Sequence, residues 1–314
     1  MTADVRPDVL PTLTARTRVV AHPRGGPCGH PDTVLAQRDD GTVVRHANTV
    51  AKAHAPDTNL ADLSPRLATA TELPEILLAP LHPTPADLHG RLVTFWPYGT
   101  PVDPETPEDA PWEDAAVLLA RLHKAPAPPR LPPMRGPAKA ARAMTRLQAA
   151  GPHPAAAPIR RAWETLPAWA RDGAPMPDIT TLCHGDLHLG QLVRHPARTG
   201  PWRLIDVDDL GVGVPAWDLA RPAAWYASGL LPPDEWTRFL TAYQQEGGPA
   251  VPPDGDPWPA LDVPARALTV QTAALAVAKS VAAHRPLDEV QQAVIDACDR
   301  MAAVPPELPQ GSTK

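Results

Sequence analysis

Cysteine is scarce in this chain of 314 residues, which contains only Cys28, Cys183 and Cys298. The three are widely spaced and form no C-x-x-C pair, so the sequence predicts neither a disulfide framework nor a zinc ribbon. Long apolar runs are lacking too. The first twenty residues carry no signal-peptide-like apolar segment, and polar side chains interrupt the most apolar late stretch, residues 267–278. We therefore expect a cytoplasmic protein that does not enter a membrane.

The sequence also lacks runs of basic residues. It has 29 lysines and arginines against 35 acidic residues, which gives a formal net charge of −6. A nucleic-acid-binding protein usually carries a basic patch that displaces counterions, so the composition predicts no nucleic-acid partner. Only five of the bases are lysines. A lysine inside an apolar strand is therefore harder to explain as generic surface charge.

Proline, by contrast, is abundant. The 44 prolines exceed the usual share of about 5% nearly threefold, which argues against a helical array or a coiled coil. The chain is nevertheless 43% hydrophobic and contains nine tryptophans, too apolar a composition for a disordered protein. We expect a globular protein with proline-rich connections.

The first hundred residues are rich in short β-branched runs separated by turn signals, a pattern typical of an antiparallel meander. The runs predict five strands, at residues 33–38, 42–46, 49–54, 76–78 and 92–95. A helix is expected over 60–73. We assign residues 1–96 to an N-terminal lobe and the proline-rich residues 97–111 to a hinge or linker.

Beyond the linker, the hydrophobic spacing becomes that of helices. Apolar residues recur at helical intervals over 115–122, 236–243, 270–281 and 287–301. The sequence therefore predicts an α+β protein in which a small antiparallel sheet precedes a larger, mostly helical C-terminal lobe, residues 112–314.

The residues best suited to chemistry lie in the irregular segment 181–218. Asp186 follows a His-Gly pair, and Asp206 ends the apolar run 202–205. A strand, a hairpin turn and a second strand between them would bring the two carboxylates together, with Gln191 at the start of the hairpin. Two carboxylates and an amide oxygen form a hard-oxygen site suited to Mg²⁺.

The pattern H-G-D-x-x-x-x-[N/Q], followed fifteen residues later by I-D, resembles the aminoglycoside phosphotransferase and choline kinase group, relatives of protein kinases. The resemblance implies a protein-kinase-like fold that uses ATP and Mg²⁺, in which residues 1–96 form the nucleotide-binding lobe. It implies that Asp186 is the catalytic base and that Gln191 and Asp206 hold the metal. Gln191 stands where most members have Asn, and the string HGDLHLGQ is similar to that of bacterial maltokinases.

The same resemblance assigns roles to residues outside this segment. Lys52, in V-A-K at the end of the third predicted strand, would pair with the α- and β-phosphates. Asp62 and Glu72 both qualify as its acid partner. The hinge that meets adenine would run through residues 92–98; its expected contact residues are Phe95, Trp96 and Pro97. His184 would brace the catalytic loop, and Asp218 would accept hydrogen bonds from the backbone of that loop.

Several assignments stay open in the sequence. The segment that covers the phosphates is either the glycine-rich stretch 24–29 or the turn 39–41. His188 either touches the substrate or faces solvent. For Asp208 and Asp209 a solvated loop is the simpler interpretation, and attraction of a cationic substrate is the alternative.

The function predicted is ATP- and Mg²⁺-dependent phosphoryl transfer to a hydroxyl of a small-molecule acceptor, an aminoglycoside or a sugar-like compound. A sugar or amino-sugar kinase of primary metabolism is the alternative to an antibiotic-resistance enzyme. Two other classes compete. His184, Asp186 and His188 form H-x-D-x-H, which with Asp206 suits a metal-dependent hydrolase. The departures from the family pattern are also compatible with a nucleotide-binding pseudokinase.

Overall fold

The computed structural model describes residues 9–26, 28–38, 41–177 and 180–303, and the chain forms two compact units. The first unit comprises Met1–Leu118, Pro128–Pro132 and Leu189–Asp208; the second comprises Leu119–Ala127, Pro133–His188 and Asp209–Lys314. Each predicted domain is one continuous stretch of the chain, whereas each observed unit combines three separate stretches. The segment Leu189–Asp208, placed in the C-terminal lobe from the sequence, belongs to the first unit.

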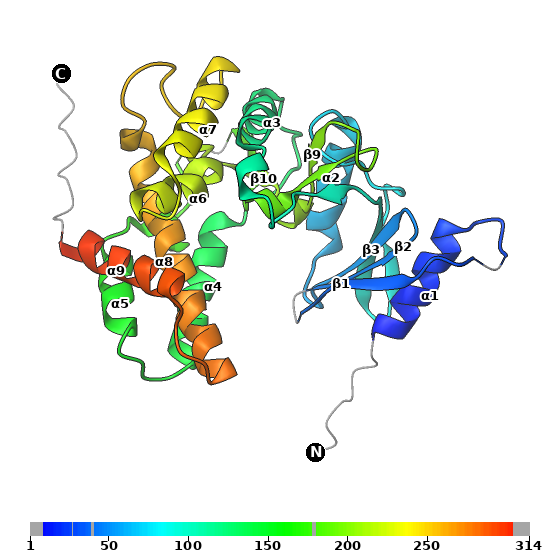
Figure 1. The fold of residues 1–314 in the computed structure, drawn as a ribbon, viewed down its shortest axis with the longest axis horizontal. Helices are drawn as coiled ribbons and strands as arrows, with labels where there is room; N and C mark the ends of the chain where they lie inside the picture. Colours follow the sequence, from blue (N-terminus) through cyan, green and yellow to red (C-terminus); the bar gives the residue numbers. More distant parts are fainter. Residues whose placement is uncertain (1–8, 27, 39–40, 178–179, 304–314) are drawn as a thin grey trace. The chain divides into compact units, whose positions relative to one another are not determined.

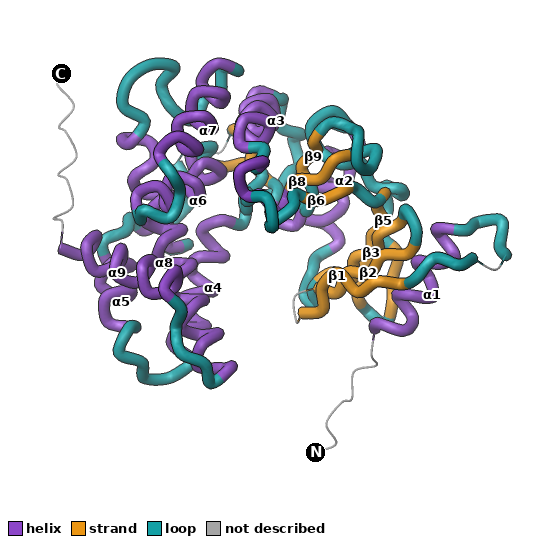
Figure 2. The backbone as a smooth tube through the Cα atoms, in the orientation of Figure 1, coloured by secondary structure: helices purple, strands orange, loops and turns teal. Residues whose placement is uncertain are grey.

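An antiparallel five-stranded sheet dominates the first unit, in the order β1-β2-β3-β5-β4 (Figure 2). The strands are β1 (Asp32–Arg38), β2 (Gly41–His46), β3 (Thr49–His54), β4 (Ala86–Leu88) and β5 (Arg91–Pro97). The strand expected at 76–78 is wrong: Leu77 makes only an isolated bridge to Leu204, and β4 completes the sheet. Three apolar residues mark a buried segment but do not distinguish a strand from a buried loop.

Two helices accompany this sheet. Helix α1 (Val9–Ala21) was not expected from the sequence; it packs against β2 and β3, and its Leu13 belongs to the same core as Val44 and Ala51 (Figure 1). Helix α2 (Leu60–Glu72) matches the expected helix. Asn59 caps it by accepting a hydrogen bond from the backbone N–H of Ala61.

A smaller sheet in the first unit positions two of the expected metal ligands. It contains β6 (Thr100–Pro101), β8 (Leu192–Arg194) and β9 (Trp202–Leu204), in the order β6-β8-β9. The β8–β9 hairpin confirms the strand–turn–strand prediction. Leu192 pairs with Leu204, so Gln191 and Asp206 lie just outside the same end of the hairpin.

The second unit is mostly helical (Figure 2). Its helices are α4 (Gly136–Ala149), α5 (Ala156–Glu164), α6 (Ala216–Ala227), α7 (Pro233–Gln245), α8 (Trp258–Ala283) and α9 (Glu289–Ala303). Helix α3 (Trp112–Lys124) runs from the first unit into the second. The four predicted helical stripes coincide with α3, α7, α8 and α9.

The core of the second unit forms where α4, α5 and α9 pack on α8. A two-stranded antiparallel pair, β7 (Thr181–Cys183) and β10 (Gly211–Gly213), flanks the segment that carries Asp186. Within the described parts of the chain, no helix is both long and apolar enough to cross a bilayer.

Candidate active site

Lys52 lies between two carboxylates of the first unit. Its Nζ donates a hydrogen bond to Oδ1 of Asp206 at 2.6 Å and lies 2.9 Å from Oδ2 of Asp208. Its acid partners are therefore Asp206 and Asp208. The two acids considered from the sequence, Asp62 and Glu72, are exposed on α2.

The charges in this cluster keep one another ionised. Burial alone would lower the pKa of Lys52, but Asp206 and Asp208 outweigh it and raise that pKa. Burial would likewise raise the pKa of Asp208, yet the charges of Lys52 and His54 hold it well below the ordinary value. His54 Nδ1 lies 2.9 Å from Oδ1 of Asp208. Asp208 is thus part of a partly buried ion-pair cluster, and the expected solvated loop is wrong for it.

Asp206 has an unusual backbone conformation, with φ at 66°. A side chain other than glycine in this left-handed region costs about 1–3 kcal/mol, although Asp tolerates it better than most residues. Such strain persists only where neighbouring interactions hold the residue, and here the contact with Lys52 contributes. Backbone strain of this kind is typical of functional positions.

An apolar cavity adjoins the Lys52 cluster within the first unit. Its walls are formed by Leu35, Val43, Val50, Leu78, Trp96, Pro97, Tyr98, Gly99, Val193 and Ile205, and its polar residues include Lys52, Gln191, Asp206 and Asp208. A cavity with apolar walls and a charged end suits a ligand with a flat apolar part and an anionic part.

Two of the three expected hinge residues, Trp96 and Pro97, line this cavity, but Phe95 does not. The side chain of Phe95 is 6% exposed and packs in the core of the sheet. Its carbonyl already accepts a hydrogen bond from the N–H of Leu81 at 2.8 Å. The reason is strand alternation: neighbouring residues of β5 face opposite sides of the sheet.

The oxygen donors on the cavity wall fit a hard cation. Gln191 is buried, and its amide belongs to the same cavity wall as the carboxylates of Asp206 and Asp208. Carboxylate and amide oxygens are the ligands that Mg²⁺ prefers, so this donor set suits that ion.

Asp186 belongs to the second unit and is held by two cations. Lys139, from α4, donates to Asp186 Oδ2 at 2.6 Å, and Arg221, from α6, donates to Oδ1 at 2.8 Å. Lys139 also donates to Oδ2 of Asp209 at 2.7 Å. Asp209 is 9% exposed, so the expected solvated loop is wrong for this residue as well.

These cations set the protonation state of Asp186. Burial alone would raise its pKa, but Lys139 and Arg221 outweigh burial and lower it. The pKa of the neighbouring His188 is lowered as well: burial, together with the charge of Arg221, brings it to about 4. At neutral pH, Asp186 is therefore a carboxylate and His188 is uncharged.

The backbone before Asp186 is fixed by Asp218, near the start of α6. Asp218 accepts hydrogen bonds from the N–H groups of His184 and Gly185 at 2.6 and 2.7 Å, as the sequence predicts. His123 lies 3.0 Å from Asp218 through Nε2 and 2.7 Å from the Tyr243 hydroxyl through Nδ1. The loop is thus tied to α3 and α7 through a buried polar network.

Gly185 is required where it stands. Its φ is 84°, and a Cβ atom there would lie 2.3 Å from the carbonyl oxygen of Asp209. Any other residue would force the two loops apart. The His-Gly-Asp motif therefore reflects close packing of the loop as well as chemistry.

The sequence profile of the phosphotransferase enzyme family matches residues 29–262. The chain belongs to this family. No curated protein sequence matches it. Its fold is protein-kinase-like, because solved structures of kinases and phosphotransferases that act on small molecules resemble it over nearly the whole chain.

One similar structure is a choline/ethanolamine kinase family protein from Mesorhizobium loti, with 16% identity and a TM-score of 0.58 over 93% of this chain and 94% of the other. Another is an aminoglycoside phosphotransferase, APH(4)-Ia, in complex with AMP-PNP and hygromycin B, with 14% identity and a TM-score of 0.60 over 92% and 99%. A macrolide 2′-phosphotransferase from Brachybacterium faecium is 18% identical, with a TM-score of 0.51 over 94% and 100%.

Sequence reasoning missed several charged residues of this phosphotransferase. His54, Lys139 and Arg221 were not singled out, and Asp208 and Asp209 were read as solvated. Two signals were present: His54 lies two residues beyond Lys52, hence on the same face of β3, and Arg221 is one helical turn beyond Asp218. For Lys139 the only signal was the scarcity of lysine.

The geometry disfavours the hydrolase alternative. Both carboxylate oxygens of Asp186 are already bound by Lys139 and Arg221. A transition metal held by His184, Asp186 and His188 would have to displace Lys139 or Arg221 from the carboxylate. It would also place a further positive charge beside the cation that stayed. The family assignment points the same way.

Proposed function

We propose that this phosphotransferase transfers the γ-phosphoryl group of Mg²⁺-ATP to a hydroxyl of a small molecule. The observation that carries the proposal is Lys52, held between Asp206 and Asp208 at the edge of an apolar cavity. An ammonium group there can pair with phosphate oxygens, while the apolar walls receive a base. Support comes from APH(4)-Ia, which is similar in fold and was solved with AMP-PNP.

On the nucleotide side, Trp96 and Pro97 would contact adenine and Lys52 would bind the α- and β-phosphates. Gln191 and Asp206 would hold Mg²⁺, which when bound neutralises charge on the phosphates. Because its pKa is raised, Lys52 stays protonated at every pH at which the enzyme is folded and active.

Leu35 of β1 and Val43 of β2 both line the cavity, so these two strands border the site of the proposed phosphates. Of the two candidates for a segment that covers the phosphates, the turn 39–41 contains Asp39 and Asp40, which lie outside the described part of the chain. In the other candidate, 24–29, Cys28 contacts His46 at the last residue of β2.

On the acceptor side, Asp186 would orient the hydroxyl and accept its proton. Its lowered pKa makes it a weak base. Phosphoryl transfer through a loose transition state depends mainly on positioning and on charge neutralisation, so a weak but well-oriented carboxylate suffices. Only four residues lie between Asp186 and Gln191, so a short segment of chain joins the proposed base to the proposed metal ligands.

The charges around Asp186 favour an uncharged, sugar-like acceptor over an aminoglycoside. Lys139 and Arg221 balance Asp186 and Asp209, and Arg135 lies 3.7 Å from Asp209 as a third cation. A polyamine would meet positive charge here, whereas a neutral alcohol would not. We therefore infer that the acceptor has no amine next to the reacting hydroxyl.

A coupled ADP-release screen over neutral sugars, amino sugars and aminoglycosides tests this function. With a substrate found, Asp186→Asn should lower turnover about 10²–10⁴-fold while nucleotide binding persists. Asp206→Asn should instead remove the Mg²⁺-dependent part of the thermal shift produced by AMP-PNP. Asp254→Asn, at an exposed position, is the matched control.

Two results would overturn the proposal. The first is wild-type turnover in both Asp186→Asn and Asp206→Asn. The second is a wild-type protein that AMP-PNP with Mg²⁺ does not stabilise at any concentration. Turnover confined to aminoglycosides would leave phosphoryl transfer standing and contradict the inference about the acceptor.

A further inference from the structure

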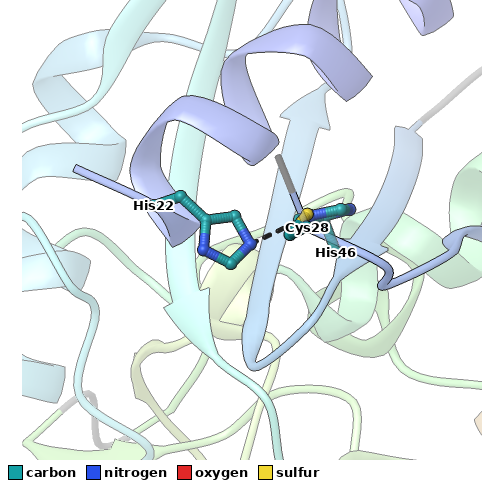
Figure 3. Close-up of side chains that lie close together, drawn as sticks. All are labelled: His22, Cys28 and His46. Atoms are coloured by element: carbon teal, nitrogen blue, oxygen red, sulfur yellow. Dashed lines mark hydrogen bonds between the residues drawn. The ribbon is translucent and has the colours of Figure 1, made fainter. Parts of the chain in front are cut away.

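A cluster of metal-binding side chains lies in the first unit, outside the residues assigned to phosphoryl transfer. It contains His22, immediately after α1, Cys28, in the loop that follows, and His46, the last residue of β2 (Figure 3). The Nε2 atoms of the two histidines are 3.2 Å apart, and Cys28 Sγ lies 3.1 Å from Nε2 of His46. Three ligand atoms from three separate segments thus converge on one point.

The Nδ1 atom of His46 faces a carboxylate on the far side of the ring from Cys28 and His22. Nδ1 lies 2.8 Å from a carboxylate oxygen of Asp32, which also pairs with Arg18. In a neutral imidazole, a proton on Nδ1 leaves Nε2 with its lone pair directed at His22 and Cys28. One lone pair cannot accept good hydrogen bonds from both neighbours, whereas a single cation can accept a lone pair from each of the three atoms.

We propose that His22, Cys28 and His46 bind a divalent transition metal of the zinc class, with Asp32 orienting His46. In a tetrahedral zinc site, bond lengths of about 2.0 Å to nitrogen and 2.3 Å to sulfur place ligand atoms about 3.3–3.6 Å apart. The observed separations of 3.1 and 3.2 Å need only a small adjustment. The contact of Asp32 with His46 is the carboxylate–histidine arrangement that accompanies metal ligands.

The fourth position of such a site falls to His30 or to water. The ring of His30 stacks on His22 with centroids 5.8 Å apart, and its centroid is 6.2 Å from that of His46. Cys28 is exposed, so an ion can enter from solvent.

A metal here would join α1 to the sheet by coordinate bonds. The apolar packing of α1 involves Leu13 and its neighbours, and the site would add a second attachment at the end of the helix. Binding to the folded state alone raises stability.

Cobalt titration of the full chain, without a polyhistidine tag and freed of metal by chelation, tests this proposal. We expect one equivalent of Co²⁺ to bind, with a thiolate-to-cobalt charge-transfer band in the near ultraviolet and visible ligand-field bands of a tetrahedral site. Zn²⁺ should displace the Co²⁺ and abolish both. Competition with a chromogenic chelator then gives the Zn²⁺ affinity.

Variants assign the ligands. Cys28→Ser should abolish the charge-transfer band, and His22→Asn or His46→Asn should weaken Zn²⁺ binding more than about 100-fold. Asp32→Asn should weaken it about 10–100-fold, because it removes only the orienting contact. Cys298→Ala and His89→Asn, which alter residues outside the cluster, are the matched controls. Loss of the tetrahedral spectrum in His30→Asn would identify the fourth ligand as His30, and its retention would identify water.

The proposal is overturned if the wild-type chain binds neither Co²⁺ nor Zn²⁺ at micromolar concentrations. It is also overturned if Cys28→Ser and His46→Asn keep the wild-type spectrum and affinity. Circular dichroism of each variant shows whether it folds, and Cys28, on an exposed loop, is the position least disturbed by substitution. None of these readouts requires phosphoryl transfer, so the result is independent of the proposed function.

Discussion

The two units of this phosphotransferase each contain an ionic cluster, and the clusters differ in charge balance. In the first unit, Lys52 faces Asp206 and Asp208, and His54 lies beside Asp208. In the second unit, three cations, Lys139, Arg221 and Arg135, surround Asp186 and Asp209. Carboxylates therefore outnumber lysine and arginine in the first cluster, whereas lysine and arginine outnumber carboxylates in the second.

This difference matches the two tasks of a kinase. In the proposed function the nucleotide would arrive with a metal ion and several negative charges, so its site would need both an ammonium group and carboxylates. The proposed acceptor would arrive without positive charge. Under this proposal the metal requirement belongs to one unit and the choice of acceptor to the other, and each of the two assignments can be tested separately.

The largest expected effect is on stability and concerns the brace in the second unit. Asp218→Ala would leave the N–H groups of His184 and Gly185 and the ring of His123 without their buried acceptor. We expect a loss of about 3–5 kcal/mol in the free energy of unfolding, measured by urea titration. Asp218→Asn, which keeps one acceptor oxygen, should lose less. An Asp218→Ala protein as stable as wild type would show that the network does not hold the loop.

The next effect concerns the first cluster. Lys52→Met removes the cation between Asp206 and Asp208, so kcat/KM for ATP should fall about 100-fold or more. Lys279→Met, at an exposed lysine of the second unit, is the matched control and should behave like wild type. If Lys52→Met and Lys279→Met had equal kinetic constants, Lys52 would have no role in nucleotide binding.

Much of the first cluster could be predicted from sequence because its signals are local. Lys52 sits in a short strand, and Gln191 and Asp206 flank a hairpin whose turn and strands are visible in the printed residues. The His-Gly-Asp motif located Asp186 in the same way. These positions depend on secondary structure alone, which periodicity and turn residues determine well.

The partners of those residues could not be predicted, because they depend on tertiary packing. Lys139 and Asp186 are 47 residues apart, and nothing in the spacing pairs them. The cluster of His22, Cys28 and His46 is a similar case: its ligands come from a helix end, a loop and a strand end. The strand prediction for residues 76–78 failed for a different reason, since three apolar residues fit a buried loop as well as a strand.

A smaller effect tests how the second cluster tunes Asp186. Lys139, Arg221 and His188 are the ionisable groups that act on this carboxyl, and at neutral pH only the first two are charged. Because its pKa is lowered, the wild-type acid limb of kcat should lie below the ordinary range of Asp. Lys139→Met removes one positive charge, so the limb should move to higher pH by about one unit or more.

The measurement is a pH–rate profile at saturating substrates. The same charges make Asp186 contribute to folding stability above its unfolded pKa, and that contribution is lost as pH falls through its lower folded pKa. In Lys139→Met the loss should therefore begin at higher pH. An unchanged acid limb in this variant would mean that Arg221 alone sets the pKa, or that another group limits the rate.

The smallest effect compares the thiols of the two units. Cys28, in the first unit, is exposed, whereas Cys183 and Cys298, in the second, are buried. Burial raises the pKa of Cys298 to about 12 and raises that of Cys183 well above its ordinary value. Because the thiolate is the reactive form, a disulfide reagent should modify one thiol per native chain and three after denaturation.

The control is Cys28→Ser, which should reduce the number of thiols modified in the native chain to none. Reaction of a second thiol at the rate of Cys28 would contradict the buried placement of Cys183 and Cys298. Prior addition of Zn²⁺ should slow the single reaction, which ties this comparison to the proposed metal site.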